Sequence, residues 1–395
     1  MRNATVVPVR IYLDHNATTP PAAEVVDRMA AALREQFGNP SSVHHFGQVA
    51  KAALDDARSS TAALIGGDPS EIVFTSSGTE SDNVAIRGVA EALEVTGKRH
   101  LIATAIEHEA VLNTLKALAR RGWKTTLLPV DQSGIVALPD LEAALTDDTA
   151  LVSVMHANNE IGTIQPVAQL ARIAKARGAL FHTDAVQTAG KIPLDVKALG
   201  VDLLSISAHK FYGPKGAGAL WIRRGVRLLP PMTGGKQERS RRAGTENVAG
   251  IIGLGVAAQL ARGKMSAEAD RLAALRDRLE EGILATVSGT AVNGARSPRV
   301  PNTTNVSFDR IEAESLLIGL DLAGIAVSTG SACSSGTLEP SHVLKAMGFP
   351  AHRTQNSIRF SLGTANTDAD VDRVLEVLPG VVEKLRNLTR AVVRA

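Results

Sequence analysis

Cysteine is nearly absent from this chain of 395 residues, which contains only one, Cys333. A single thiol cannot form an internal disulfide, and it cannot supply the several ligands of a structural zinc site. Long apolar runs are also missing. Residues 1–13 contain no run of signal-peptide length, and residues 249–261 are too short and too rich in glycine to span a bilayer. We therefore expect a protein of the reducing cytoplasm that is neither exported nor embedded in a membrane.

A strong excess of charge of either sign is missing as well. The 43 lysines and arginines against 40 aspartates and glutamates leave a net charge of +3, which is too small to indicate a nucleic-acid-binding surface. The basic cluster at residues 239–242 is local, and either a solvated loop or a neighbouring phosphate would explain it. Hydrophobic residues make up 44% of the chain and charged residues 21%. This is an ordinary soluble balance, and the length predicts two domains or one large α/β domain with an appendage.

Short apolar runs alternate with helical patterns through the first two-thirds of the chain. Buried strands are predicted at residues 71–74, 100–103, 151–155, 180–182 and 203–206, and helices at residues 84–93, 111–120 and 167–177. The alternation predicts right-handed crossovers and a mainly parallel sheet covered by helices on both faces. Ligands of such sheets gather at the carboxyl ends of the strands.

A second pattern begins after an amphipathic stretch in which Leu272, Leu275, Leu279 and Ile283 lie on one helical face. Beyond this stretch, new strands are predicted at residues 305–308 and 357–360. We therefore expect a domain boundary near the start of the amphipathic helix.

The single cysteine lies in a run of small residues, GSACSSG at 330–336. A free cysteine is often a small buried hydrophobe. Here the glycines loosen the backbone and the serines contribute hydroxyls rather than apolar area, so the neighbours argue against burial. We predict a thiol that can be reached, which leaves a nucleophile, a redox group or a residue without a chemical role.

Polar residues follow several of the predicted strands. The hydroxyl-rich junction at residues 75–83 opens a helix, where it is either an ordinary helix cap or a phosphate site; it lacks the spacing of a nucleotide-binding loop. Asp184 ends one strand and Lys210 follows the next. The pair is either a salt bridge, or a Schiff-base lysine with an aspartate that keeps a pyridine nitrogen protonated. A phosphate cradle, an aspartate and a lysine are together what pyridoxal phosphate requires.

Several short motifs taken together are very specific. They are YLDHNATT at 12–19, Glu107 with His108, NNEIG at 158–162, Asp184 with Gln187, SAHKFYGPKG at 207–216, RAGTEN at 242–247, and GSACSSG at 330–336 with LEPSH at 338–342. From residue 12 to about residue 363, the chain resembles the cysteine desulfurases of the NifS/IscS group, which are class V aminotransferases.

The resemblance implies an α/β, fold-type I pyridoxal-phosphate enzyme that forms a homodimer. It implies a large cofactor-binding domain at residues 16–262, and a smaller α+β domain of residues 1–15 and 263–395 with the catalytic cysteine loop at about 326–338. The implied reaction removes sulfur from L-cysteine to give L-alanine and a persulfide on Cys333. The persulfide then supplies an iron–sulfur scaffold protein or another sulfur acceptor. No intrinsic metal site is implied, and Cys333 would be an iron–sulfur ligand only through its persulfide during transfer.

The resemblance also assigns roles by position. Lys210 resembles the Schiff-base lysine that moves the substrate α-proton, Asp184 the partner of the pyridine nitrogen, Gln187 the partner of the ring hydroxyl, and His108 the histidine stacked on the ring. The phosphate-binding positions are Gly78, Thr79, Ser207 and His209, with Thr245 contributed by the partner subunit. The substrate carboxylate would be held by Asn159, which also borders the cofactor, and by Arg359. Without the resemblance, His108 is an imidazole at a helix start, and Arg359 is a strand-edge arginine in a surface ion pair.

Two other functions remain open at this point. The first is an aminotransferase or selenocysteine lyase on the same fold, and a cysteine in a long glycine- and serine-rich loop argues against amino-group transfer. The second is a non-catalytic sulfur-carrier or scaffold-binding protein. The intact set of Lys210, Asp184, Gln187 and His108 argues against this second function.

Overall fold

The computed structural model describes residues 10–330 and 340–394. Cys333 and most of the predicted cysteine loop lie outside the described residues, so the prediction that the thiol is reachable stays a prediction. None of the helices in the described ranges is both long enough and apolar enough to cross a membrane.

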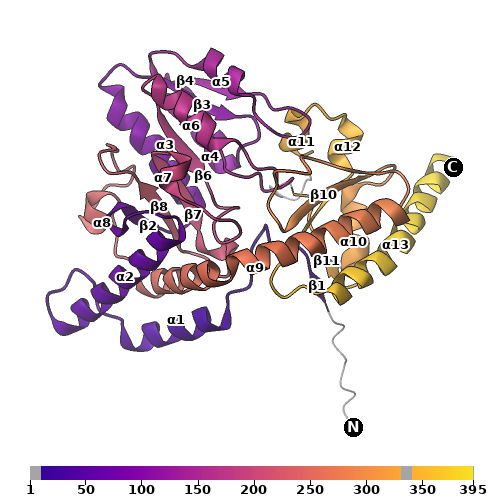
Figure 1. The fold of residues 1–395 in the computed structure, drawn as a ribbon, viewed down its shortest axis with the longest axis horizontal. Helices are drawn as coiled ribbons and strands as arrows, with labels where there is room; N and C mark the ends of the chain where they lie inside the picture. The colour runs from indigo at the N-terminus through magenta and orange to yellow at the C-terminus, as the bar shows by residue number, and fades with distance from the viewer. Residues whose placement is uncertain (1–9, 331–339, 395) are drawn as a thin grey trace, which may run out of the picture.

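Strands and helices alternate through most of the described chain (Figure 1). The strands are β1 (Ile11–Tyr12), β2 (Ile72–Thr75), β3 (His100–Thr104), β4 (Lys124–Leu128), β5 (Thr149–Ser153), β6 (Leu180–Asp184), β7 (Leu203–Ser207), β8 (Gly218–Ile222), β9 (Thr290–Val292), β10 (Thr303–Phe308), β11 (Ile325–Ala326) and β12 (Ser357–Ser361). The helices are α1 (Ala23–Glu35), α2 (His45–Leu64), α3 (Gly78–Glu94), α4 (Glu109–Ala119), α5 (Leu138–Ala144), α6 (Val167–Ala176), α7 (Val196–Leu199), α8 (Gln237–Ser240), α9 (Val248–Thr286), α10 (Ala313–Leu322), α11 (His342–Ala346), α12 (Ala351–Gln355) and α13 (Asp368–Arg394). Short 3-10 turns are η1 (Pro69–Glu71) and η2 (Ala208–Lys210).

The main sheet has seven strands within the described residues, in the order β2-β8-β7-β6-β5-β3-β4. Neighbours from β7 to β4 run parallel, and β8 runs antiparallel to both β7 and β2. The prediction of a mainly parallel α/β sheet is therefore confirmed. β8 was not predicted, because it returns directly from β7 without a helical crossover to mark it.

The sheet is buried on both faces, as the apolar runs predicted, except along its edge strand β4. In β2, Ile72 and Phe74 contribute to one hydrophobic cluster and Val73 to another, because successive strand residues point to opposite faces. Helices α3 and α4 pack in the Val73 cluster, and α2, α5, α6 and α9 pack in the other. The carboxyl ends of β6 and β7 are left clear for the site described below.

The long helix α9 joins the main sheet to the second group of elements (Figure 1). Its first turns place Ile251 and Leu254 in the core of the main sheet, and its last turns place Leu279 and Ile283 in a separate core with β10, β12 and α13. The amphipathic pattern predicted only the second half. Residues 249–258 at its start are almost entirely buried and rich in small apolar residues, so they carry no periodic signal, and the helix begins at Val248 instead of near the predicted boundary.

Candidate active site

A cavity of about 610 Å³ lies at the carboxyl ends of the parallel strands. Asp184 is the last residue of β6 and Ser207 the last of β7, as expected for a ligand site in such a sheet. The cavity collects nearly all predicted site residues: Gly78, Thr79, His108, Asn159, Asp184, Gln187, Ser207, His209, Lys210 and Arg359. Thr245 does not line the cavity of its own chain and is exposed.

Lys210 ends the 3-10 turn η2, which carries its side chain from the end of β7 into the cavity. Its Nζ donates to the backbone oxygens of Asn16 at 2.5 Å and Ala17 at 2.8 Å. The described residues hold no ion pair between Lys210 and Asp184, so the salt-bridge alternative is wrong. Burial, together with the positive charge of Arg359, lowers the pKa of Lys210 to about 8. A substantial fraction of the amine is therefore neutral and able to act as a nucleophile or base near neutral pH.

Asp184 is a buried carboxylate whose Oδ1 accepts a hydrogen bond from the Val186 backbone N–H at 2.8 Å. Burial raises the pKa of Asp184, and the nearby His108 and Lys210 oppose this shift. A cation placed against the other carboxylate oxygen would favour the ionised form of Asp184, which burial disfavours.

Two further carboxyls lie buried behind Asp184. Burial raises the pKa of Asp82 well above its usual value, and the charge of Asp184 adds to the shift. Burial likewise raises the pKa of Glu107 to about 8, against hydrogen bonds from Thr104 and Met155. Glu107 is therefore mainly protonated at neutral pH, and burial favours the neutral form of Asp82, which reduces the negative charge that competes with Asp184.

The N-terminus of α3 opens into the cavity. The Ser77 hydroxyl accepts a hydrogen bond from the Glu80 N–H at 3.1 Å and so caps the helix. The N–H groups of Gly78 and Thr79 have no partner within the described part of the chain, and the Ser207 hydroxyl is buried without one. The cap that the sequence offered as an alternative is present, and it leaves the donors of an anion site free.

His108 and His209 border the same cavity. His108 precedes α4, and its Nδ1 accepts a hydrogen bond from the Ala110 N–H at 3.1 Å. His108 therefore does have the structural role predicted for a histidine at a helix start. Its imidazole is exposed and lies beside the cavity. His209 contacts the Thr18 hydroxyl at 3.1 Å, and burial lowers its pKa to about 4. His209 is consequently neutral at neutral pH.

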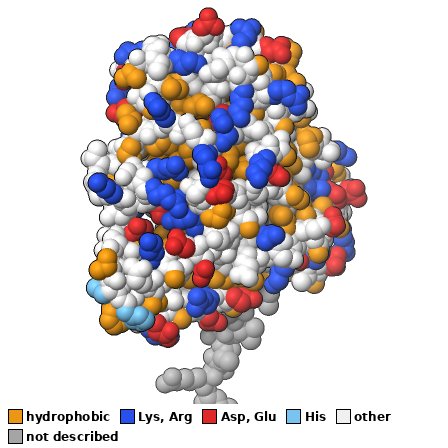
Figure 2. Space-filling view, turned by 60° about the vertical axis from the view of Figure 1, so that its left-hand side comes forward, with side chains coloured by type: hydrophobic (Ala, Val, Ile, Leu, Met, Phe, Trp, Pro, Cys, Tyr) orange, Lys and Arg blue, Asp and Glu red, His pale blue; other side chains and the backbone are white. Residues whose placement is uncertain are grey.

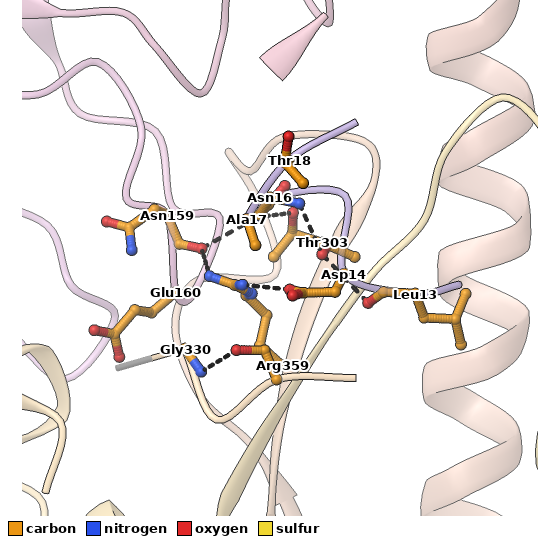
Figure 3. Close-up of polar contacts among 12 residues, drawn as sticks. Leu13, Asp14, Asn16, Ala17, Thr18, Asn159, Glu160, Thr303, Gly330 and Arg359 are labelled. Carbon is orange, nitrogen blue, oxygen red and sulfur yellow. Dashed lines mark hydrogen bonds and ion pairs between the residues drawn. The ribbon is translucent and has the colours of Figure 1, made fainter. Parts of the chain in front are cut away.

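Arg359 points toward the N-terminal segment (Figure 3). One terminal nitrogen donates to the Asp14 carboxylate at 2.6 Å, and the other donates to the Asn159 backbone oxygen at 3.0 Å. Arg359 lies on the edge strand β12, as one alternative held. However, its side chain is only 4% exposed, so the ion pair is buried rather than on the surface.

The sequence motifs did not identify Asn16 as the residue that connects this site. Its backbone oxygen accepts from Lys210 and from Gln187 Nε2. Its side chain donates to Thr303 at 2.8 Å and to the Asn159 oxygen at 3.1 Å, as Figure 3 shows. The residue lies within the motif at 12–19, but the backbone oxygen that accepts from Lys210 and Gln187 has no sequence signal of its own.

Comparisons with known proteins agree with this geometry. Residues 11–374 match the class-V aminotransferase family. The chain is 53% identical over 379 residues to a cysteine desulfurase IscS of Dictyoglomus turgidum, covering 96% of both chains. It is 52% identical to the cysteine desulfurase IscS of Methanosarcina thermophila, covering 96% of this chain and 93% of that one.

Solved structures share the fold. A NifS-like protein superimposes with a TM-score of 0.90 at 42% identity, covering 95% of this chain and all of that one. The structure described as SspA in complex with cysteine matches with a TM-score of 0.79 at 35% identity, covering 89% of this chain and 98% of that chain. The chain belongs to the class-V aminotransferase family. Its fold is therefore the predicted fold type I, and the cofactor of this family is pyridoxal 5'-phosphate.

The cavity of this family member has the groups that pyridoxal phosphate needs. The orphaned Ser207 hydroxyl and the free N–H groups of α3 fit an anionic phosphate. The buried Asp184 fits a protonated ring nitrogen, and the Lys210 amine with its lowered pKa fits the aldehyde. The residues present therefore fit the cofactor.

Proposed function

We propose that this protein is a cysteine desulfurase that releases L-alanine from L-cysteine and retains the sulfur on Cys333. The observation that carries the proposal is the cavity in which the Lys210 amine, the Asp184 carboxylate and the anion site at α3 converge. Its likeness to curated cysteine desulfurases over nearly the whole chain supports the same reaction.

Pyridoxal phosphate, when bound, supplies an aldehyde for amines and a ring that accepts electrons released at the substrate Cα. Lys210 is the amine that holds the cofactor and that moves the substrate α-proton once it is free. Asp184 would keep the ring nitrogen protonated, Gln187 would serve the ring hydroxyl, and His108 would lie against the ring. Gly78, Thr79, Ser207 and His209 would hold the phosphate.

Arg359 and Asn159 bind the carboxylate of L-cysteine in this proposal. The Arg359 guanidinium has a fork of donors that suits a carboxylate. Asp14 already occupies one of its terminal nitrogens, and the Asn159 backbone occupies the other. These two contacts fix the plane of the guanidinium, so the substrate meets an arginine that is already oriented.

Cys333 performs the sulfur transfer in this proposal. Its thiolate forms an S–S bond to the substrate sulfur as the Cβ–S bond of the substrate breaks. The electron pair of the broken bond stays on carbon, which takes up a proton and becomes the methyl group of alanine. The substrate sulfur, with its hydrogen, becomes the outer sulfur of the persulfide, and the proton lost from the Cys333 thiol balances the proton gained by the carbon. No external oxidant or reductant is needed to reach the persulfide.

A homodimer is part of the proposal. Thr245 is exposed and lies outside the cavity of its own chain, which suits a residue that completes the partner's phosphate site. The corner formed by α1 and α2 exposes Leu33, Phe37 and Phe46 at 68%, 69% and 53%. Figure 2 shows apolar and histidine side chains together at the lower left of one face. A second copy would cover such a corner.

The persulfide needs an acceptor, for which we propose an iron–sulfur scaffold protein or another sulfur-accepting protein in the cytoplasm. We also propose that residues 16–262 form the large domain, and residues 1–15 with 263–395 the small one. The separate hydrophobic cores at the two ends of α9 support this division.

The decisive experiment measures sulfide and alanine formed from L-cysteine in the presence of a thiol reductant. Equal amounts of both products support the desulfurase. Pyruvate or a transferred amino group without sulfide would indicate an aminotransferase. The absence of any product would indicate a non-catalytic sulfur-carrier or scaffold-binding protein. Faster alanine formation from selenocysteine than from cysteine would identify a selenocysteine lyase.

Lys210→Ala and Lys215→Ala form the matched pair for this assay. Lys210→Ala should abolish turnover in a folded protein, because Asp184 and the phosphate donors at the start of α3 come from other segments. Lys215 is exposed and outside the cavity, so Lys215→Ala should retain activity. The reverse pattern would show that the lysine assignment is wrong.

A further inference from the structure

Lys191 lies beside the candidate active site, where its Nζ contacts neutral oxygens. Its Nζ donates to Oε1 of Gln187 at 2.9 Å and to Oδ1 of Asn16 at 3.0 Å. In the described ranges, no carboxylate forms an ion pair with it. Burial, with the positive charges of Lys210 and Arg359, lowers the pKa of Lys191 well below its usual value. This placement is unfavourable for an isolated lysine, and the two hydrogen bonds have to offset it.

The two contacts of Lys191 are not equivalent. Oδ1 of Asn16 also accepts from Asn302 Nδ2 at 3.1 Å, so Asn16 keeps a donor if Lys191 is removed. Oε1 of Gln187 has no second donor among the residues that the structure describes. Loss of Lys191 would therefore leave the amide oxygen of Gln187 without a donor, whereas Oδ1 of Asn16 would keep one.

The same contacts determine where the oxygen and the nitrogen of the Gln187 amide lie. Nε2 donates one hydrogen to the Asn16 backbone oxygen at 3.0 Å, and its second hydrogen remains available in the cavity that Gln187 lines. A flipped amide would place its oxygen against that carbonyl oxygen, which is repulsive, and its nitrogen against Nζ of Lys191, which would lose its acceptor. Lys191 and Asn16 therefore together hold Gln187 as a donor.

We propose that Lys191 is a positioning residue that acts through Gln187, holding the amide so that nitrogen and not oxygen serves the ring hydroxyl of bound pyridoxal phosphate. This role presupposes the proposed function, in which Gln187 contacts that hydroxyl. A donor stabilises the ionised ring oxygen and makes the proton on the neighbouring Lys210 nitrogen easier to lose. Lys191 thereby lowers the pH at which the Lys210 nitrogen, when joined to the cofactor, loses its proton.

Other ionisable groups surround this pair. Those whose charges act on Lys191 or Lys210, or are acted on by them, are Arg359, His15, His209, Asp14 and Asp184. Burial lowers the pKa of both His15 and His209 to about 4. The two histidines are therefore neutral where the cofactor titrates, so their own titration does not contribute to the change in absorption.

The test records the visible absorption of the cofactor-loaded dimer against pH. In Lys191→Met, the titration midpoint should rise by about half to one pH unit, which is the size of one neutral hydrogen bond. Lys197→Met is the matched control, because Lys197 is an exposed lysine of the nearby helix α7, and its midpoint should equal that of the parent.

A double substitution separates positioning from direct charge. Gln187→Ala should raise the midpoint in the same direction, and adding Lys191→Met to it should change nothing further. A further rise in the double variant would show that Lys191 acts by its charge and not through Gln187, and the proposal would fail. An unchanged midpoint in loaded Lys191→Met would also overturn it.

Lys191→Gln replaces Lys191→Met if the latter does not fold. It keeps an amide donor without the charge, and its midpoint should lie between those of the parent and Gln187→Ala; a midpoint equal to the parent's, or a shift that persists in the Gln187→Ala background, would overturn the proposal. Failure of the proposed function itself looks different. The parent protein would then show no visible cofactor band, or would be loaded and form no alanine from cysteine.

Discussion

At the scale of single residues, two backbone carbonyls hold three of the functional side chains of the site. The oxygen of Asn16 accepts from Lys210 and Gln187, and the oxygen of Asn159 accepts from Arg359. The motifs predicted Lys210, Gln187 and Arg359 because their side chains carry the chemistry. They could not predict these acceptors, because a backbone oxygen looks the same in every residue and only the fold brings it near.

The lowered pKa of Lys210 leads to a pH prediction. Burial, followed by the charge of Arg359, brings the pKa to about 8. The neutral amine is the form that attacks an aldehyde, and its fraction grows as pH rises through the pKa. The rate of pyridoxal phosphate incorporation into the cofactor-free protein should therefore rise through about pH 8 and level off above it.

Stopped-flow absorption measures this rate. The reference is the same cofactor reacting with a free alkyl amine such as 6-aminohexanoate, which corrects for the titration of the cofactor itself. A midpoint near that of an ordinary lysine, at about pH 10, would show that the amine is not desolvated in the folded protein.

Cys333→Ser addresses the one catalytic residue outside the described ranges. A serine hydroxyl is a far poorer sulfur nucleophile than a partly ionised thiol, so alanine and persulfide formation should fall by more than roughly a hundredfold, about 3 kcal/mol in barrier. Cofactor absorption and its response to added cysteine should remain. An unfolded variant would show Cys333 to be a core residue, and a fully active one would exclude the mechanism.

At the scale of elements, the sequence predicted best where an apolar run was fully buried. β5, β6 and β7 were found because each is a short apolar run between polar junctions. β4 was missed because it is an edge strand, and much of its Lys124–Leu128 sequence is polar and partly exposed. The start of α9, residues 249–258, was missed because burial on nearly all sides removes the periodicity on which such predictions depend.

The N-terminus of α3 provides a prediction at this scale. The Ser77 hydroxyl caps the helix through the Glu80 N–H, so Ser77→Ala should destabilise the cofactor-free protein by about 1 kcal/mol in urea unfolding. Ser266→Ala is the control, because Ser266 is exposed in the middle of α9. It should change the free energy of unfolding by less than about 0.5 kcal/mol. Equal effects of the two substitutions on the free energy of unfolding would show that the Ser77 cap does not stabilise the helix.

At the scale of the whole molecule, the site draws on segments that are far apart in the chain. Asn16, Lys210 and Arg359 come together because the N-terminal segment passes from β1, beside β11, to the carboxyl ends of the main sheet. Sequence patterns locate each segment but not this convergence. The resemblance to a family supplied it, and the cavity confirms that these segments meet.

Thr245 offers a test of whether the site is shared between two subunits. If Thr245 completes the partner's phosphate site, Thr245→Ala should weaken cofactor affinity by roughly tenfold, the value of one hydrogen bond to a charged group. Lys210→Ala should be inactive at any cofactor concentration. Dimers that combine one subunit of each kind contain one site with both an intact Lys210 and an intact Thr245, provided the threonine crosses the interface.

These mixed dimers can be isolated with two different affinity tags after co-expression. At a cofactor concentration below the dissociation constant of Thr245→Ala, they should recover about half the activity of the parent, because one of the two sites is complete. If Thr245 serves its own subunit, the intact lysine and the intact threonine never share a site. The mixed dimers would then be no more active than Thr245→Ala alone, and the shared site would be excluded.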